Sequence, residues 1–122
     1  MSANSLYHYK ALVDRVVDGD TIDVVLDLGF DLKMSSRVRF AGINAPESRT
    51  KDPVEKEQGL AAKRYVEDWV GALQNRIIIQ TQLDERGKFG RVLGVILSDD
   101  GACLNDEMVS LGHARPYDGG KR

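Results

Sequence analysis

The feature that most constrains the fold is a strict alternation of apolar and polar residues over Thr21–Leu28. Its even-numbered residues are all Ile, Val or Leu, and its odd-numbered residues, apart from one valine, are polar. A period of two is typical of a strand with one face on a core and the other in water. The preceding segment, Leu6–Val17, is rich in β-branched and aromatic residues, and Asp18-Gly19 separates the two segments with a tight turn. The sequence therefore predicts an N-terminal β-hairpin.

The rest of the chain divides into three more strands and two helices. The predicted strands are Ser35–Ile43, Ile77–Leu83 and Arg91–Leu97. A helix is predicted at Glu57–Leu73, and its core stripe consists of Ala61, Tyr65, Trp69 and Leu73, filled by Ala62, Val66 and Val70. A short helix follows with Leu104, Met108 and Leu111 on one face. Gly29–Met34 is predicted as a turn, Asn44–Pro53 as a loop, and the tail His113–Arg122 as too short for a further element.

This order of elements predicts the fold class. Three strands, a helix, two strands and a short helix suit a β-rich α+β fold, namely a five-stranded OB-fold barrel with a helix after strand 3 and a short helix after strand 5. A chain of 122 residues fits one domain, which we expect to span residues 1–122.

Composition limits the surroundings and the partners. The formal net charge is −2, so any site for a polyanion must be a local basic patch. Cys103 is the single cysteine, which excludes an internal disulfide, and we expect no disulfide-linked partner. The segment Met1–Val13 lacks the apolar run of a signal peptide, and no segment approaches the ~18 apolar residues of a membrane span. We expect a cytoplasmic monomer that does not contact membranes.

Three polar clusters fall where OB barrels bind their ligands, on strands 2 and 3 and at the loops joining strands 1–2 and 4–5. They are Asp18–Thr21, the segment from Arg39 to Glu47, and Lys88–Arg91. Each one alone is typical of an ordinary turn or of solvated charge. Their occurrence together at one end of one predicted barrel indicates a functional site.

Taken together, these segments resemble the staphylococcal-nuclease (thermonuclease-like) family. The matching segments are Val16–Ile22, Arg39–Glu47, Lys88–Arg91, Asn105–Val109 and Gly112–Ala114. The resemblance extends from about Tyr9 to Tyr117. It implies an OB barrel that cleaves DNA and RNA in a calcium-dependent reaction and leaves 3′-phosphate ends.

The resemblance also implies a metal site. Asp20 corresponds to a direct metal ligand, Asn44 to a position normally held by a second aspartate ligand, and Ala45 to a residue that offers its carbonyl oxygen. Hard cations take oxygen ligands, so we expect Ca²⁺, with Mg²⁺ or Mn²⁺ as alternatives. No Cys/His spacing suggests zinc. Asn44 removes one negative charge from the site, which weakens the expected affinity for metal.

Three residues are expected to be catalytic. By the resemblance, Glu47 holds the attacking water, and Arg39 and Arg91 clamp the scissile phosphate. A guanidinium remains charged and binds two phosphate oxygens at once, so it can stabilise the charge that develops as water attacks phosphorus. Glu47 is placed to accept the proton of the water, whereas no general acid is evident. Lys88, Arg115 and Tyr117 are the expected substrate-binding residues.

Two functions remain open at this point. The first is a metal-dependent phosphodiesterase acting on DNA and/or RNA, favoured because Arg39, Glu47 and Arg91 are all present. The alternative is a catalytically silent OB-fold module that binds nucleic acid or protein, for which Asn44 is the main support.

Overall fold

Strands and helices follow one another in the predicted order, with two additional short strands. The computed structural model describes residues 7–83 and 92–117. Its elements are β1 (His8–Asp18), β2 (Thr21–Gly29), β3 (Leu32–Phe40), β4 (Ile43–Asn44), α1 (Pro53–Ala72), β5 (Arg76–Leu83), β6 (Val92–Leu97), α2 (Leu104–Ser110) and β7 (Arg115–Pro116). Among these residues no helix is both long and apolar enough to cross a membrane.

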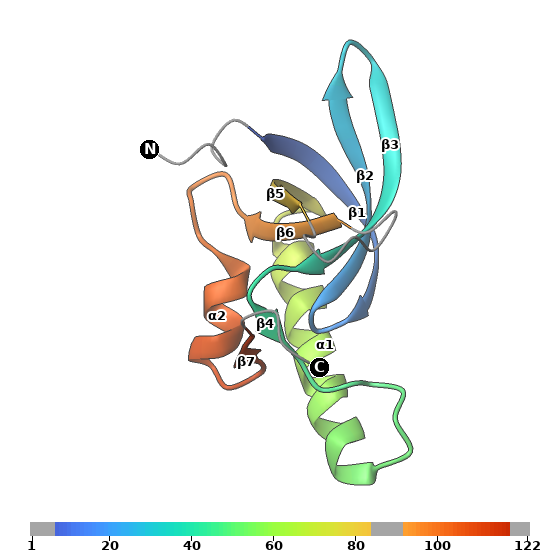
Figure 1. Cartoon of the computed structure of the whole chain (residues 1–122), viewed down its shortest axis with the longest axis vertical. Coiled ribbons are helices and arrows are strands. Elements are labelled where there is room, and N and C mark those ends of the chain that lie inside the picture. Colours follow the sequence, from blue (N-terminus) through green and yellow to red (C-terminus); the bar gives the residue numbers. More distant parts are fainter. Residues whose placement is uncertain (1–6, 84–91, 118–122) are drawn as a thin grey trace.

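Five strands close into a barrel in the order β1-β2-β3-β6-β5. Neighbouring strands are antiparallel except β3 and β6, which run parallel. The short strands β4 and β7 form a separate two-stranded sheet. Figure 1 shows α1 running below the barrel, with α2 beside it. The prediction of a five-stranded OB-fold barrel is therefore confirmed.

The barrel interior is filled by alternate residues of the strands. Ile22 and Val24 of β2 and Val38 and Phe40 of β3 are buried, as the period of two predicts. Gly94 on β6 completes the packing because it has no side chain. A Cβ there would lie 2.9 Å from Cγ1 of Val38 and 2.7 Å from Cγ2 of Ile79.

Helix α1 begins four residues before the predicted start at Glu57. Asp52 is the N-cap, and its carboxylate accepts a hydrogen bond from the Val54 backbone N at 3.0 Å. Pro53 suits the first helical position because its nitrogen has no hydrogen to leave unpaired. The prediction that Pro53 belongs to the preceding loop is therefore wrong, whereas Asp52 does lie outside the helix as its cap.

The face of α1 that packs on the barrel is part of the predicted stripe. Ala62, Val66 and Val70 are buried as predicted, together with Gly59, whereas Ala61 is exposed. Tyr65, Trp69 and Leu73 are only partly buried at the edge of the core. The centre of the buried face is therefore shifted by one residue from Ala61, and the small residues Gly59 and Ala62 allow the closer approach.

The β2–β3 hairpin is longer than predicted. Gly29–Met34 was expected to be a turn, but β2 runs to Gly29 and β3 starts at Leu32, so that only Phe30 and Asp31 lie between them. Both residues adopt the left-handed backbone conformation, with φ of 56° and 63°. Figure 1 shows the hairpin projecting past the other strands, at the end of the molecule away from α2.

The C-terminal region contains two further corrections. Leu104 and Met108 of α2 are fully buried, as predicted. Leu111, predicted on the same face, is instead the C-cap of the helix and is 56% exposed. The tail does form an element, because β7 pairs antiparallel with β4 and places Arg115 opposite Asn44. The prediction for β4 is wrong, because Ile43 was assigned to the end of the third strand and Asn44 to the following loop. The prediction for β7 is also wrong, because the tail was expected to contain no further element.

Candidate active site

Asp20 is the anchor of the site. It is a buried carboxylate at the turn between β1 and β2. Its Oδ1 accepts a hydrogen bond from Thr21 Oγ1, and its Oδ2 accepts one from the Ala45 backbone N, both at 2.9 Å. These contacts fix the orientation of the carboxylate and join the first turn of the barrel to the residue after β4.

Arg39 lies beside this carboxylate. It is on β3 directly opposite Thr21, on the outer face of the strand as predicted. Its Nη2 is 3.6 Å from Oδ2 of Asp20, and its side chain is 26% exposed. Within the described residues, the buried Nε of Arg39 has no hydrogen-bond partner. The guanidinium therefore retains unused donor capacity next to an anion.

The loop after β4 carries the other predicted residues. Asn44 is half-buried, Ala45 is buried, and the side chain of Glu47 is exposed. The Glu47 backbone N donates to Oε2 of Glu55 on α1 at 3.3 Å, which ties the backbone of this exposed residue to the helix. The backbone bond from Ala45 to Asp20 brings this loop next to the first turn.

A second carboxylate ties the same two segments together. Asp18 Oδ1 accepts hydrogen bonds from the Ser48 backbone N at 3.2 Å and from Ser48 Oγ at 2.5 Å. Ser48 is buried. The sequence analysis gave neither residue a role, although the Asp-Gly-Asp pattern offers two carboxylates at this turn. Asp18 positions the loop, and Asp20 faces Arg39.

Helix α1 supports the site from behind through small residues. A Cβ at Gly59 would lie 2.3 Å from the carbonyl oxygen of Glu47, so the loop backbone rests directly on the helix. A Cβ at Gly19 would lie 2.7 Å from Cβ of Ala62. Any larger residue at these positions would push the loop or the turn away from the barrel. A glycine in the interior of a predicted helix was a signal for such a close approach.

Asn105 on α2 braces the end of β3. Its Nδ2 donates to the carbonyl oxygens of Ala41 at 2.9 Å and Gly94 at 3.1 Å, and its Oδ1 accepts from the Ile96 backbone N at 2.9 Å. The amide is buried and uses both its donor and its acceptor groups. It therefore fixes the turn that leads from Arg39 toward Asn44.

The remaining predicted residues divide into two groups. Arg115 is exposed on β7, and the Tyr117 backbone N donates to the Gly42 carbonyl oxygen at 2.8 Å, so both lie at the β3–β4 end of the site. Lys88 and Arg91 lie outside the described residues. The structure thus brings Asp20, Arg39, the loop after β4 and the β7 residues to one end of the barrel.

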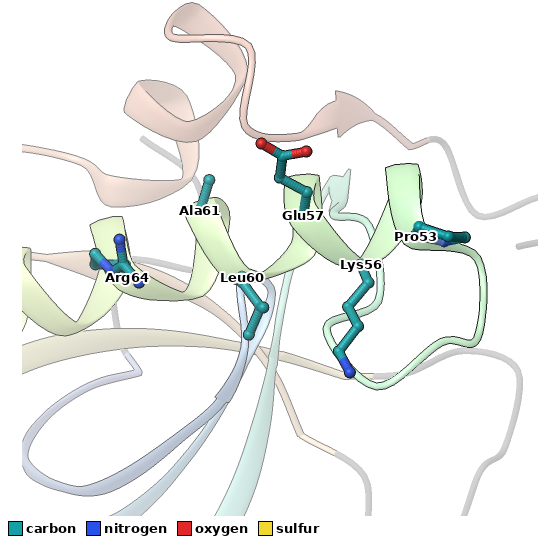
Figure 2. Close-up of a pocket in the computed structure, with 6 residues that line it drawn as sticks. All are labelled: Pro53, Lys56, Glu57, Leu60, Ala61 and Arg64. Atoms are coloured by element: carbon teal, nitrogen blue, oxygen red, sulfur yellow. The ribbon is translucent and has the colours of Figure 1, made fainter.

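Two hollows lie near α1, and one of them adjoins the site. A hollow of about 650 Å³ is lined by residues of the β4 loop, α1 and the segment before β7, among them Asn44, Ala45, Glu55, Gln58, His113 and Arg115. A second hollow, of about 450 Å³, is lined by α1 alone. Figure 2 shows its side chains diverging from the helix, with Glu57 on one side and Lys56 on the other. No predicted site residue lines this second hollow.

Comparison with known proteins identifies the family. Residues 37–121 match the family described as "Staphylococcal nuclease homologue". The chain belongs to the staphylococcal nuclease family. The matched region includes Arg39, Asn44, Glu47, Arg115 and Tyr117, while Asp20 precedes it.

Three proteins named as nucleases are similar to this chain over most of its length. Endonuclease YhcR of Bacillus subtilis is 31% identical over 114 residues, which cover 89% of this chain and 9% of that protein. An uncharacterized endonuclease of Escherichia coli is 31% identical over 106 residues, covering 87% of this chain and 60% of that protein. The thermonuclease of Staphylococcus intermedius is 30% identical over 100 residues, covering 82% and 52%. The chain thus spans between about a tenth and three fifths of the length of these relatives.

The residues that the resemblance assigns to a metal site offer oxygen atoms, which are the ligands that a hard divalent cation prefers. Among residues 7–83 and 92–117, no three His, Cys, Asp or Glu side chains gather to hold a metal ion by themselves. The donors on offer are the Asp20 carboxylate, the Asn44 amide oxygen and the Ala45 carbonyl oxygen. Such neutral oxygens are ordinary ligands of Ca²⁺ and Mg²⁺, and the low charge predicts weak binding.

Proposed function

We propose that this chain is a nuclease that hydrolyses phosphodiester bonds in DNA and/or RNA with the help of a divalent cation. The observation that carries the proposal is the buried Asp20 carboxylate, held 3.6 Å from the guanidinium of Arg39 at the ligand-binding end of an OB barrel. Membership in a family of nucleases supports it. We further propose that residues 1–122 act as one domain and that hydrolysis needs residues of one chain only.

Asp20 is the principal ligand in this proposal. Asn44 and Ala45 complete the protein's share of the coordination through their oxygens. When bound, Ca²⁺, Mg²⁺ or Mn²⁺ acts as a Lewis acid on a phosphoryl oxygen. The two hydrogen bonds to the Asp20 carboxylate hold it in one orientation, so the site needs little rearrangement on binding.

The arginines bind the scissile phosphate. The Arg39 side chain is 26% exposed, and its contact to Asp20 is long at 3.6 Å, so the exposed part of the guanidinium can bind a phosphate oxygen. Arg91, which lies outside the described residues, completes the clamp in this proposal. Both guanidinium groups stabilise the additional negative charge of the pentacovalent transition state.

Glu47 activates the attacking water in this mechanism. Its carboxylate is exposed, while its backbone is fixed by Glu55 and by contact with Gly59. A carboxylate on a fixed backbone can accept the proton as the water oxygen attacks phosphorus. Lys88, Arg115 and Tyr117 bind the adjoining nucleotide, and breakage of the bond to the 5′ oxygen leaves a 3′-phosphate.

A cleavage assay tests the proposal. The purified chain, at one concentration, is incubated with labelled single- and double-stranded DNA and RNA, with Ca²⁺, Mg²⁺ or Mn²⁺, or with a chelator. We expect cleavage that needs a divalent ion and stops on chelation. Full activity in chelator, or no activity with any of the three ions, would overturn the proposal.

Asn44 supports a second candidate, a silent OB-fold module that binds nucleic acid or protein. The side chain at this position lacks the negative charge of a second aspartate ligand, so metal binding can be too weak for catalysis. The same assay separates the two functions when it is paired with a binding measurement. Binding of labelled oligonucleotide without cleavage at 10 mM metal ion, about tenfold above the weak calcium-binding range, would favour the silent module.

A further inference from the structure

The projecting β2–β3 hairpin carries an apolar surface that nothing in the described structure covers. Its exposed apolar side chains are Leu28 (38% exposed), Phe30 (98%), Leu32 (60%) and Met34 (43%), and we call these four residues the hairpin patch. Single exposed apolar residues are ordinary, but a contiguous group on one projection is typical of an interaction site. Figure 1 shows no other labelled element beside the tip of this hairpin.

The patch continues the core-facing side of the sheet beyond the barrel. Met34 lies opposite Leu26, which is almost completely buried, and it shares its strand face with Val38, which is fully buried. The alternation of apolar residues therefore continues along the hairpin beyond the residues that the barrel core covers. In a monomer these apolar side chains would be exposed to water without packing against another part of the described structure.

Phe30 at the tip adds a second observation. It has a φ of 56°, a conformation that favours glycine or asparagine, and its side chain makes no buried contact. The neighbouring Gly29 (φ 83°) and Asp31 (φ 63°) are residues that suit such a turn. Phe30 thus combines an unfavourable backbone conformation with a fully exposed aromatic side chain, which indicates a contact outside the monomer.

The outer edge of the same hairpin has backbone groups available for pairing. β3 pairs with β6 only over Val38–Phe40. The Phe40 N–H points to Asp20 of the β1–β2 turn, whereas the Ala41 N–H points to Gly94 of β6. Because these directions alternate along a strand, the N–H and C=O groups of Lys33 and Ser35 point away from β2. Within the described residues, no strand pairs with this part of the edge.

We propose that a second copy of this chain docks on this surface, with the two β3 edges paired antiparallel about a two-fold axis. Such an interface is self-complementary, because each copy offers the same hairpin patch and the same β3 edge, which no strand of the described residues covers. The proposal differs from the monomer expected from the sequence, because the hairpin was not expected to extend past the barrel.

Among the three registers centred on Lys33, Met34 or Ser35, the charges on β3 favour one. Pairing centred on Lys33 would oppose two lysines, and pairing centred on Ser35 would oppose Lys33 with Arg37 of the second copy. Pairing centred on Met34 places Lys33 opposite Ser35 and brings Arg37 near Asp31 of the second copy, with the two Met34 side chains at the axis. Opposite charges stabilise a cross-strand pair and like charges destabilise it, so the register centred on Met34 is favoured.

The charge of the hairpin argues against a polyanion or an anionic membrane as the partner. Asp27 and Asp31 outnumber Lys33 between Asp27 and Ser35, so this surface has no attraction for a polyanion or an anionic membrane. A second copy needs no such attraction, since backbone pairing and apolar contact supply the interface.

Disulfide trapping tests the register directly. In a Cys103→Ser background, Met34→Cys would place two cysteines at a non-hydrogen-bonded antiparallel pair, where Cα atoms lie about 4.5 Å apart. This separation is within the range of a disulfide. We expect rapid formation of a covalent dimer under mild oxidation for Met34→Cys. The matched control Ser35→Cys faces a different residue of the second copy and should cross-link at least 10-fold more slowly. Equal rates for the two variants, or no dimer from Met34→Cys, would overturn the register.

Analytical ultracentrifugation of the unmodified chain between 1 and 200 µM tests the association itself. We expect a monomer–dimer equilibrium that is weakened at least 10-fold by Leu32→Lys and by Phe30→Asn. Phe30→Asn suits the backbone of the turn, so loss of folding cannot explain its effect. Leu60→Lys, on an exposed position of α1, is the control and should associate like the unmodified chain. A chain that stays monomeric throughout, or a dimer that both hairpin variants leave intact, would contradict the proposal whether or not the chain cleaves nucleic acid.

Discussion

Two arginines on the same face of β3 have opposite surroundings. Arg37 donates to both carboxylate oxygens of Asp23, at 2.8 and 3.2 Å, and this hydrogen bonding holds the pKa of Asp23 below its usual range. Arg39 has a longer contact to Asp20 and a buried Nε without a partner in the described residues. Arg37 is engaged in a close ion pair within the protein, whereas the guanidinium of Arg39 makes only a long contact and is 26% exposed.

We therefore predict that Arg39→Lys lowers kcat about 10²-fold or more, because a lysine cannot make the bidentate contact to the transition state. Arg91→Lys should have a similar effect. Arg37→Lys is the matched control and should leave kcat close to that of the unmodified chain. Steady-state cleavage of a labelled oligonucleotide measures all three. A larger loss for Arg37→Lys than for Arg39→Lys would show that the phosphate lies elsewhere on β3.

Asn44 gives a prediction about metal affinity. Calcium sites with few charged ligands bind at about 10⁻⁴–10⁻³ M, and Asn44→Asp would add a second anionic ligand beside Asp20. We expect tighter binding of Ca²⁺ in calorimetric titration and a lower metal concentration for half-maximal cleavage. Without metal, the added like charge should lower the melting temperature. Equal affinities of both forms would mean that residue 44 does not face the ion.

At the scale of elements, the position of the active-site loop depends on how closely α1 approaches it. Gly59 provides this approach because a Cβ would overlap the Glu47 carbonyl group, at 2.3 Å from its oxygen and 2.4 Å from its carbon. Gly71, on the same helix, has no atom within 4 Å of such a Cβ. Substitutions at these two glycines therefore separate the effect of the contact between Gly59 and Glu47 from the general effect of glycine in a helix.

We predict that Gly59→Ala destabilises the fold by about 1–3 kcal/mol, as overpacking does, and also lowers kcat by displacing Glu47. Gly71→Ala should instead stabilise the fold by about 0.5–1 kcal/mol through helix propensity, without an effect on cleavage. Urea unfolding and the cleavage assay measure the two consequences. If Gly59→Ala behaved like Gly71→Ala, the loop would not rest on the helix.

At the scale of the whole molecule, a polar network joins the two helices. The Glu107 carboxylate on α2 accepts hydrogen bonds from the Tyr65 hydroxyl at 2.6 Å and from Trp69 Nε1 at 3.2 Å, both on α1. Tyr65 also stacks on His113, with ring centroids 5.2 Å apart. The hydrogen bond to Glu107, followed by burial, raises the pKa of Tyr65 to about 12.

This network predicts a loss of stability at high pH. The folded state holds the Tyr65 proton up to about pH 12, while the unfolded state releases it near pH 10. The stabilisation is therefore complete below about pH 10 and declines as pH rises toward 12. We expect the melting temperature to fall over this interval, and to fall less in Tyr65→Phe. Tyr9→Phe, on β1, is the control and should keep the unmodified profile. Identical profiles for both variants would contradict the role of the network.

The sequence by itself determined the fold class, and it predicts the residues of the candidate site. Periods of two and of about four residues are set by neighbours along the chain, so β2, α1 and the order of the elements could be predicted. The roles expected of Asp20, Arg39 and Glu47 come from the resemblance to the nuclease family, and they agree with the general use of oxygen ligands and guanidinium groups in phosphate chemistry.

Only the tertiary structure decided how these residues meet. Asp20 bonds to Ala45, 25 residues away, and Asp18 bonds to Ser48, 30 residues away, and no local pattern encodes either contact. The pairing of β4 with β7 depends likewise on where the barrel and α2 place the tail. The length of the β2–β3 hairpin escaped prediction for a related reason. Alternation shows which side chains share a face, but where the barrel stops covering that face depends on strands elsewhere in the chain.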